Sequence, residues 1–168
     1  DLFEENDPWK KRAEDLKSRA YEITQFLTDI VDFDRINAAF EGTITYHDSC
    51  SGLRQLGVKQ QPRKLLSKVD NLTLNEMEEA ETCCGFGGTF CVKYPDISNR
   101  MVSNKTQYIS DSGATTLVGG DLGCLLNMAG KLKREGKQIQ ARHVVEILAG
   151  MTDTPAIGEA EYELANEL

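Results

Sequence analysis

The chain has 168 residues, a formal net charge of −8 and a hydrophobic content of 40%, which are ordinary values for a globular domain with a buried core. The excess of acidic residues disfavours nucleic-acid binding, because that function needs a basic face. No apolar run approaches the roughly 20 residues of a membrane span and no apolar leader is visible, so we expect a cytoplasmic protein without a direct membrane span.

Residues 8–31 have the pattern of one long amphipathic helix. Asn6 or Asp7 can cap its start, and Pro8 suits its first turn. Apolar residues recur along it at spacings of three and four, namely Leu16, Ala20, Ile23, Leu27 and Ile30. We therefore expect this helix to cover one face of a sheet. A connector with a short helical turn around residues 35–40 is expected to follow it.

The rest of the chain alternates between strand and helix patterns. β-Branched or alternating segments predict strands over residues 43–47, 72–77, 114–118 and 139–142. Helices are predicted over residues 53–56, 62–69, 96–112, 121–136 and 144–151. This alternation predicts an α/β fold, with an open, mainly parallel four-stranded sheet and helices on both faces.

Composition divides the chain into three segments. Residues 1–42 are expected to be a helical segment, residues 43–151 the α/β domain, and residues 152–168 a mobile acidic tail. The chain starts at Asp1 without an initiator methionine, so we expect it to be part of a longer protein.

Five cysteines are the most informative residues in the sequence. Their number is odd and their spacing is not that of a small secreted disulfide framework, which favours metal or redox chemistry in a reducing cytoplasm. Two of them are adjacent, in Cys83-Cys84-Gly85-Phe86-Gly87-Gly88. Adjacent thiols rarely bond to each other and more naturally bind one shared metal ion or cluster. The glycines would allow the backbone to approach that metal ion or cluster closely.

Three cysteine positions follow predicted strands. Cys50, the Cys83–Cys84 pair and Cys124 each lie after a strand, and the carboxyl ends of parallel strands meet at one edge of a sheet. Cys50 and Cys124 also lie near predicted helix N-termini, which favour the thiolate form. Four thiolates without histidine suit an iron–sulfur cluster or zinc.

This arrangement resembles the cysteine-rich CCG domain family, whose pattern is one cysteine, an adjacent cysteine pair followed by glycine, and a final Cys-x-x-Cys. Members include heterodisulfide reductase B subunits and the iron–sulfur subunits of anaerobic glycerol-3-phosphate dehydrogenase and glycolate oxidase. Further stretches resemble the lactate utilization protein A family, iron–sulfur subunits of an L-lactate-oxidising complex. These stretches are Tyr46–Cys50, Cys83–Phe90, Val92–Pro95 and Gly120–Asn127. The resemblance covers about residues 1–150.

The resemblance implies a cofactor, partners and a place within a longer chain. Members usually carry two CCG halves, so residues 1–42 are expected to end a preceding half, and this chain to be the C-terminal half. Cys50, Cys83, Cys84 and Cys124 would bind a [4Fe–4S] cluster. The chain would be an electron-transfer subunit, not a catalytic one, within an L-lactate- or glycolate-oxidising complex that includes a ferredoxin-like iron–sulfur subunit.

One position departs from the family pattern. Asp121 stands where the final Cys-x-x-Cys has its first cysteine, so that only Cys124 remains. Five cysteines per half accompany disulfide cleavage in heterodisulfide reductase, whereas four match an ordinary cubane, which favours electron transfer. Asp121 could approach iron or simply cap its helix. Cys91 could supply a fifth ligand or be a buried apolar side chain.

Alternative functions remain open from sequence. A structural zinc or assembly domain would use the same four cysteines, and a heterodisulfide reductase-type enzyme would use their thiol–disulfide chemistry. His47, three residues before Cys50, could hydrogen-bond to a cluster sulfur or be an ordinary residue at a strand end. The glycines at positions 85, 87 and 88 do not form a dinucleotide-binding fingerprint.

Overall fold

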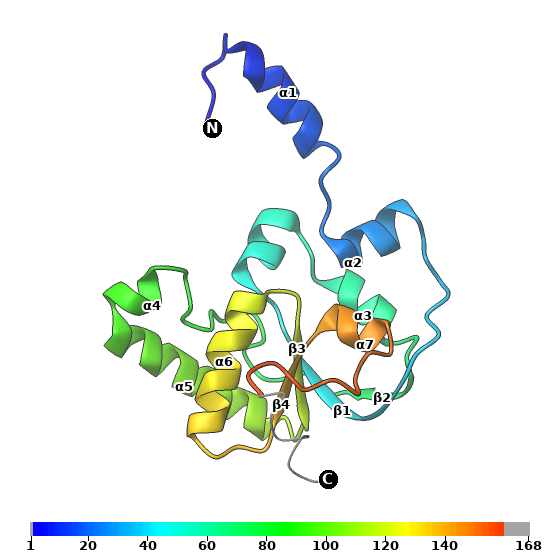
Figure 1. Cartoon of the computed structure of the whole chain (residues 1–168), viewed down its shortest axis with the longest axis vertical. Helices are drawn as coiled ribbons and strands as arrows, with labels where there is room; N and C mark the ends of the chain where they lie inside the picture. The colour runs from blue at the N-terminus through cyan, green and yellow to red at the C-terminus, as the bar shows by residue number, and fades with distance from the viewer. Residues whose placement is uncertain (1, 160–168) are drawn as a thin grey trace.

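A computed structural model describes residues 2–159 and shows a four-stranded, all-parallel sheet (Figure 1). The strand order is β2–β1–β3–β4. The strands are β1 (Ala39–His47), β2 (Asp70–Leu74), β3 (Thr116–Gly119) and β4 (Gln140–His143). The predicted fold class is therefore confirmed, and the sheet is parallel throughout.

Helices pack on both faces of the sheet because the connections between strands run in both directions across it. The connection from β1 to β2 runs one way and carries η2 (Ser51–Gln55) and α3 (Gln60–Leu66). The connections from β2 through β3 to β4 run the other way and carry α4 (Phe90–Lys93), α5 (Pro95–Asp111) and α6 (Leu122–Arg134). Right-handed crossovers in opposite directions lie on opposite faces. The last helix, α7 (Val144–Leu148), joins the α3 face.

Strand alternation divides the core into two clusters. Ile44, Tyr46 and Val118 pack with α3 and α7, whereas Leu117 packs with α5 and α6. Because His47 is three residues from Ile44 and pairs with Gly119, its side chain belongs to the α5–α6 face. That same face contains buried Cys84 and Cys124 within its cluster.

The single helix predicted over residues 8–31 is wrong. The structure has α1 (Pro8–Lys17), a break, α2 (Ile23–Gln25) and the π-helical turn η1 (Phe26–Ile30). Asp7 caps α1 as predicted, but the Glu22 carboxylate accepts from the N–H groups of Thr24 and Gln25 and starts a second helix. No α1 residue is buried, and α1 extends away from the sheet that it was expected to cover (Figure 1).

Two further differences concern the ends of the domain. No helical turn forms around residues 35–40, because β1 begins at Ala39 and pairs there with Asp70. The first part of the predicted acidic tail lies against the sheet: Ile157 N–H donates to the Ala141 carbonyl, and Arg142 donates to the carbonyls of two tail residues, Thr152 and Thr154. Residues 160–168 of the predicted tail lie outside the described part of the chain.

Within residues 2–159, no helix combines the length and the apolar character needed to cross a membrane.

The exposure of α1 predicts that it contributes little to the stability of the sheet domain. Removing residues 1–18 should change the free energy of unfolding by less than about 0.5 kcal/mol, because no buried side chain is lost. Leu117→Ala should lower it by about 2–5 kcal/mol, since Leu117 is fully buried. Urea denaturation of both variants measures the two effects. A large loss on truncation would mean that α1 packs against the domain.

Candidate metal centre

The cysteine loops meet where the chain reverses direction in the sheet. β1 and β3 are adjacent, and their last residues, His47 and Gly119, pair with each other. The chain leaves β1 toward β2 on one side and later returns to β3 on the other. Open α/β sheets bind ligands at the carboxyl ends of strands at such a switch point. Cys50 follows β1 as the N-cap of η2, the Cys83–Cys84 pair lies in the loop after β2, and Cys124 follows β3 in the first turn of α6.

Three potential metal ligands lie together at this edge. His47, Cys84 and Cys124 are buried, and one ring nitrogen of His47 and the two sulfur atoms all lie within 4.8 Å of one another. Among the described residues, neither nitrogen of His47 has a hydrogen-bond partner, although its side chain is almost completely buried. A buried imidazole without partners is costly unless a bound group contacts it. The donor set, imidazole and thiol, is one that binds zinc or iron.

Cys50 and Cys83 are only partly buried. Burial raises the pKa of Cys83, although the Gly85 N–H group donates to its sulfur at 3.4 Å and opposes this effect. Negative charge on Cys84 or Cys50 also raises the pKa of Cys83, so these thiols interact electrostatically. The structure thus brings Cys84 and Cys124 together with His47, and leaves Cys50 and Cys83 at the more exposed side of the same edge.

The pKa values of Cys84 and Cys124 shift in opposite directions. The pKa of Cys84 is lowered, chiefly because the Cys124 thiol can hydrogen-bond to its thiolate, and His47 acts in the same direction. The pKa of Cys124 is raised by the same interaction with Cys84 and by burial. One thiolate is therefore favoured at this position before any metal binds, and thiolate is the form that ligates metal.

Cys91 has a different environment. It is partly buried in α4, and its thiol donates to the Gly88 carbonyl at 3.1 Å. It is not a member of the group formed by His47, Cys84 and Cys124.

The turn after the cysteine pair requires glycine. Gly85 has φ +86°, and a Cβ atom there would lie 2.8 Å from the carbonyl oxygen of Ser98. The Ser98 hydroxyl on α5 donates to the Gly85 carbonyl at 2.8 Å, and the Asn127 amide on α6 donates to the Cys84 carbonyl at 2.9 Å. Both helices of this face therefore fix the backbone that presents Cys84.

The same loop packs on the start of α6. The ring of Phe86 covers Gly123, where a Cβ atom would lie only 2.5 Å from a ring carbon. This close approach explains why a residue without a side chain precedes Cys124.

Asp121 caps α6 and connects two cysteine loops. One carboxylate oxygen accepts from the Cys124 N–H group at 3.0 Å, and the other accepts from the Ser51 hydroxyl at 3.1 Å. Although burial raises it, the pKa of Asp121 is lowered overall because these donors stabilise the carboxylate. The capping role considered from sequence is confirmed.

A buried ion pair supports the end of β1. Asp48 accepts from both terminal nitrogens of Arg63, at 2.9 and 2.8 Å, and Arg63 also binds Glu76 on the segment after β2. The Asp48 N–H group donates to the carbonyl of Ala80, four residues before Cys84. These contacts hold the β1 end and the cysteine loop in fixed relation.

Two residues near the site were undervalued or missed from sequence. His47 was considered but could not be assigned, because the burial of both ring nitrogens depends on helices far along the chain. Lys105 was missed. The available signal is its position in α5, where it shares the buried stripe of Val102 and Ile109.

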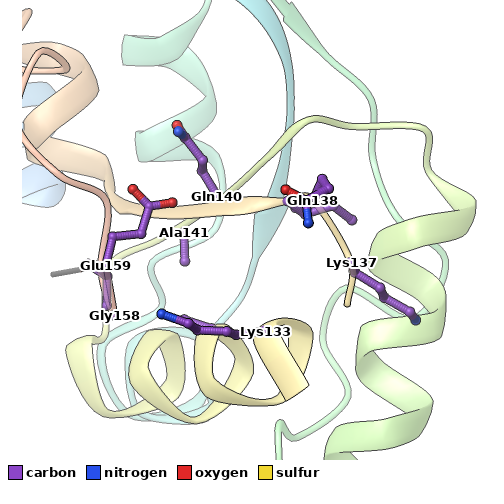
Figure 2. A pocket seen from close by; sticks show the side chains of 10 residues that line it. Lys133, Lys137, Gln138, Gln140, Ala141, Gly158 and Glu159 are labelled. Carbon is purple, nitrogen blue, oxygen red and sulfur yellow. The ribbon is translucent and has the colours of Figure 1, made fainter. Parts of the chain in front are cut away.

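One cavity lies apart from this site. This cavity has a volume of about 430 Å³ and is lined by Ala129, Lys133, residues 137–141 and residues 157–159 (Figure 2). It lies where β4 begins, at the edge of the sheet opposite the strand ends. It contains no cysteine.

The comparison with protein families agrees with this geometry. Residues 44–129, just over half of the chain, match the model of the CCG family, described as a cysteine-rich domain. The chain belongs to the cysteine-rich CCG domain family. The matched range contains all five cysteines and His47.

Three curated relatives of this CCG protein are each named lactate utilization protein A. The protein from Oceanobacillus iheyensis is 46% identical over 147 residues, which are 88% of this chain and 60% of the relative. Those from a Geobacillus species and Bacillus cytotoxicus are 44% and 42% identical, each over 88% of this chain and 62% of the relative. The chain thus spans about three fifths of the length of the relatives that it matches.

The Gly85 geometry predicts a strong local effect of a small substitution. Gly85→Ala should lower the free energy of unfolding by about 3 kcal/mol, through positive-φ strain and collision with the Ser98 carbonyl, and should reduce metal binding. Gly88→Ala is the matched control, because it also has positive φ but has open space around its Cβ position, and should cost about 1 kcal/mol. Urea denaturation and metal analysis measure both effects. Equal losses would show that the collision is unimportant.

Proposed function

We propose that this CCG domain is an iron–sulfur electron-transfer module of an L-lactate-oxidising system, with Cys50, Cys83, Cys84 and Cys124 as ligands of a [4Fe–4S] cluster. The observation that carries the proposal is the meeting, at the switch edge, of the segments that contain Cys50, the Cys83–Cys84 pair and Cys124. Beside them lies a buried imidazole that has no hydrogen-bond partner among the described residues. When bound, such a cluster supplies reversible one-electron chemistry, as expected of a relay between 2-hydroxy-acid oxidation and an electron acceptor.

Gly85 and Asp121 would support cluster binding at this edge in two different ways. Gly85 directs its N–H group at the Cys83 sulfur, and hydrogen bonds to sulfur raise the potential of iron–sulfur sites. The first turn of α6 presents Cys124 with its backbone already capped by Asp121, so the carboxylate is committed to Cys124 N–H and Ser51. Asp121 therefore serves as a helix cap in this proposal, and the ligand set remains four cysteines.

The wider assignment rests on the relatives. They are named for lactate utilization, which favours lactate over glycolate as the substrate of the system. We propose that residues 1–42 end a preceding CCG half and that residues 43–151 form the second one. The partners would be the other subunits, including a ferredoxin-like iron–sulfur subunit, in the cytoplasm. The exposed apolar residues before β1, including Phe26, Ile30 and Phe33, are compatible with such an assembly.

Anaerobic purification tests the cluster and its ligands. The protein should have a broad absorption shoulder at about 400 nm that dithionite bleaches, and Cys83→Ser should abolish it because one thiolate is lost. Cys91→Ser is the matched control and should keep the absorption, since the Cys91 thiol bonds to the Gly88 carbonyl. Absorption lost equally in both variants would contradict the proposed ligand set. A colourless protein that contains zinc would contradict the cluster itself.

One observation favours a second candidate, a structural zinc site. The donors of His47, Cys84 and Cys124 all lie within 4.8 Å of one another. Sulfur atoms on one tetrahedral zinc ion are about 3.8 Å apart, from Zn–S bonds of about 2.3 Å, so a small movement would let these donors share one ion.

His47→Gln separates the two candidates. At a single-ion site the substitution removes a ligand, and zinc affinity should fall by about 100-fold or more in competition with a chelator. At a cluster held by four cysteines the iron and sulfide content should stay close to that of the unmodified protein. X-ray absorption spectra of both proteins identify the metal and report whether nitrogen is bound to it.

A further inference from the structure

Lys105 is a buried lysine beneath the cysteine loop. It lies in the middle of α5 and has a relative exposure of 1%, which makes it the largest fully buried side chain in the described residues. Its ammonium group donates to the carbonyl oxygen of Glu79 at 2.6 Å and to that of Ala80 at 3.1 Å. These two carbonyls precede the cysteine pair by a few residues, so Lys105 holds the backbone segment that leads into Cys83 and Cys84.

The charge of Lys105 has no carboxylate partner among the described residues. None of their salt bridges, at a limit of 4.0 Å, includes Lys105. The nearby Asp48 carboxylate is committed to Arg63 by two hydrogen bonds. An ammonium group in such a position is costly unless negative charge lies close by.

The cysteine centre can supply that negative charge. Burial lowers the pKa of Lys105 to about 8, and Cys84 is the largest influence that favours the charged form, ahead of Asp48, Glu79 and Cys83. Thiolate ligands and an iron–sulfur cluster together carry net negative charge, and reduction adds one more unit. The buried ammonium group of Lys105 therefore stabilises the reduced state of the cluster more than its oxidised state.

We propose that Lys105 is a positioning residue for the metal centre and also its buried counter-charge, which raises its reduction potential. This inference rests on the proposed iron–sulfur function. Lys105 thereby performs two tasks with one side chain: hydrogen bonds to Glu79 and Ala80 hold the loop, and the ammonium charge stabilises the extra electron.

The two tasks can be separated by three substitutions. Lys105→Met removes both the charge and the donors, Lys105→Gln keeps an amide donor without charge, and Lys105→Arg keeps charge and donors. Lys133→Met is the matched control, because Lys133 is exposed and lies nine residues after Cys124 on α6, about 13 Å along the helix. It changes net charge by the same amount in a solvated position.

The experiment is an anaerobic redox titration monitored by electron paramagnetic resonance. We expect the Met and Gln variants to be harder to reduce by about tenfold in the equilibrium constant, a negative shift of about 59 mV for one electron. The Arg variant and Lys133→Met should stay close to the unmodified protein. A purely structural role would lower cluster content and stability without moving the potential of the loaded fraction.

The outcomes distinguish this inference from the proposed function. Unchanged potentials in the Met and Gln variants, or a change in Met but not in Gln, would overturn the counter-charge while leaving the cluster in place. An unmodified protein without a cluster would overturn both. If the Met and Gln variants do not retain iron, cluster content decides: retention in Arg but not in Gln supports the role of charge, and equal loss in Arg and Gln contradicts it.

Discussion

The parallel pairing of β1 with β3 is the constraint on which the candidate site depends. It places His47 opposite Gly119 and brings together loops that are about 70 residues apart in the sequence, as the hydrogen bond between Ser51 and Asp121 shows. The reversal of the chain at this pair leaves room at the carboxyl edge that no crossover helix covers. The position of the candidate site at this edge is thus a consequence of strand order.

The cysteine-pair loop has little internal structure and is held by its surroundings. Ser98, Lys105 and Asn127 each donate a side-chain hydrogen bond to a backbone carbonyl between residues 79 and 85. Side chains from two helices therefore replace the backbone bonds that a strand or helix would supply. Such a loop can present two adjacent thiols in a geometry that regular structure would not permit, and Gly85 makes the necessary turn.

The charged and titratable groups at the site differ in whether other protein groups satisfy them. The Asp48–Arg63–Glu76 network is satisfied within itself, and the Asp121 carboxylate is used by a helix N-terminus and a hydroxyl. His47 and Lys105 differ, because within residues 2–159 the first has two nitrogens without a hydrogen-bond partner and the second has no carboxylate partner. Both of these uncompensated groups lie near Cys84, which is where a bound metal and its thiolates would complete the interactions.

The sequence by itself determined the α/β class, the placement of Cys50, the Cys83–Cys84 pair and Cys124 after successive strands, and the family, because these follow from local periodicity and motif spacing. It could not determine that residues 8–31 break into separate helices, since an apolar stripe does not reveal that Glu22 starts a second helix or that α1 finds no partner. Nor could it single out His47 and Lys105. Their burial is decided by strand order and by the packing of α5 and α6, which only the tertiary structure contains.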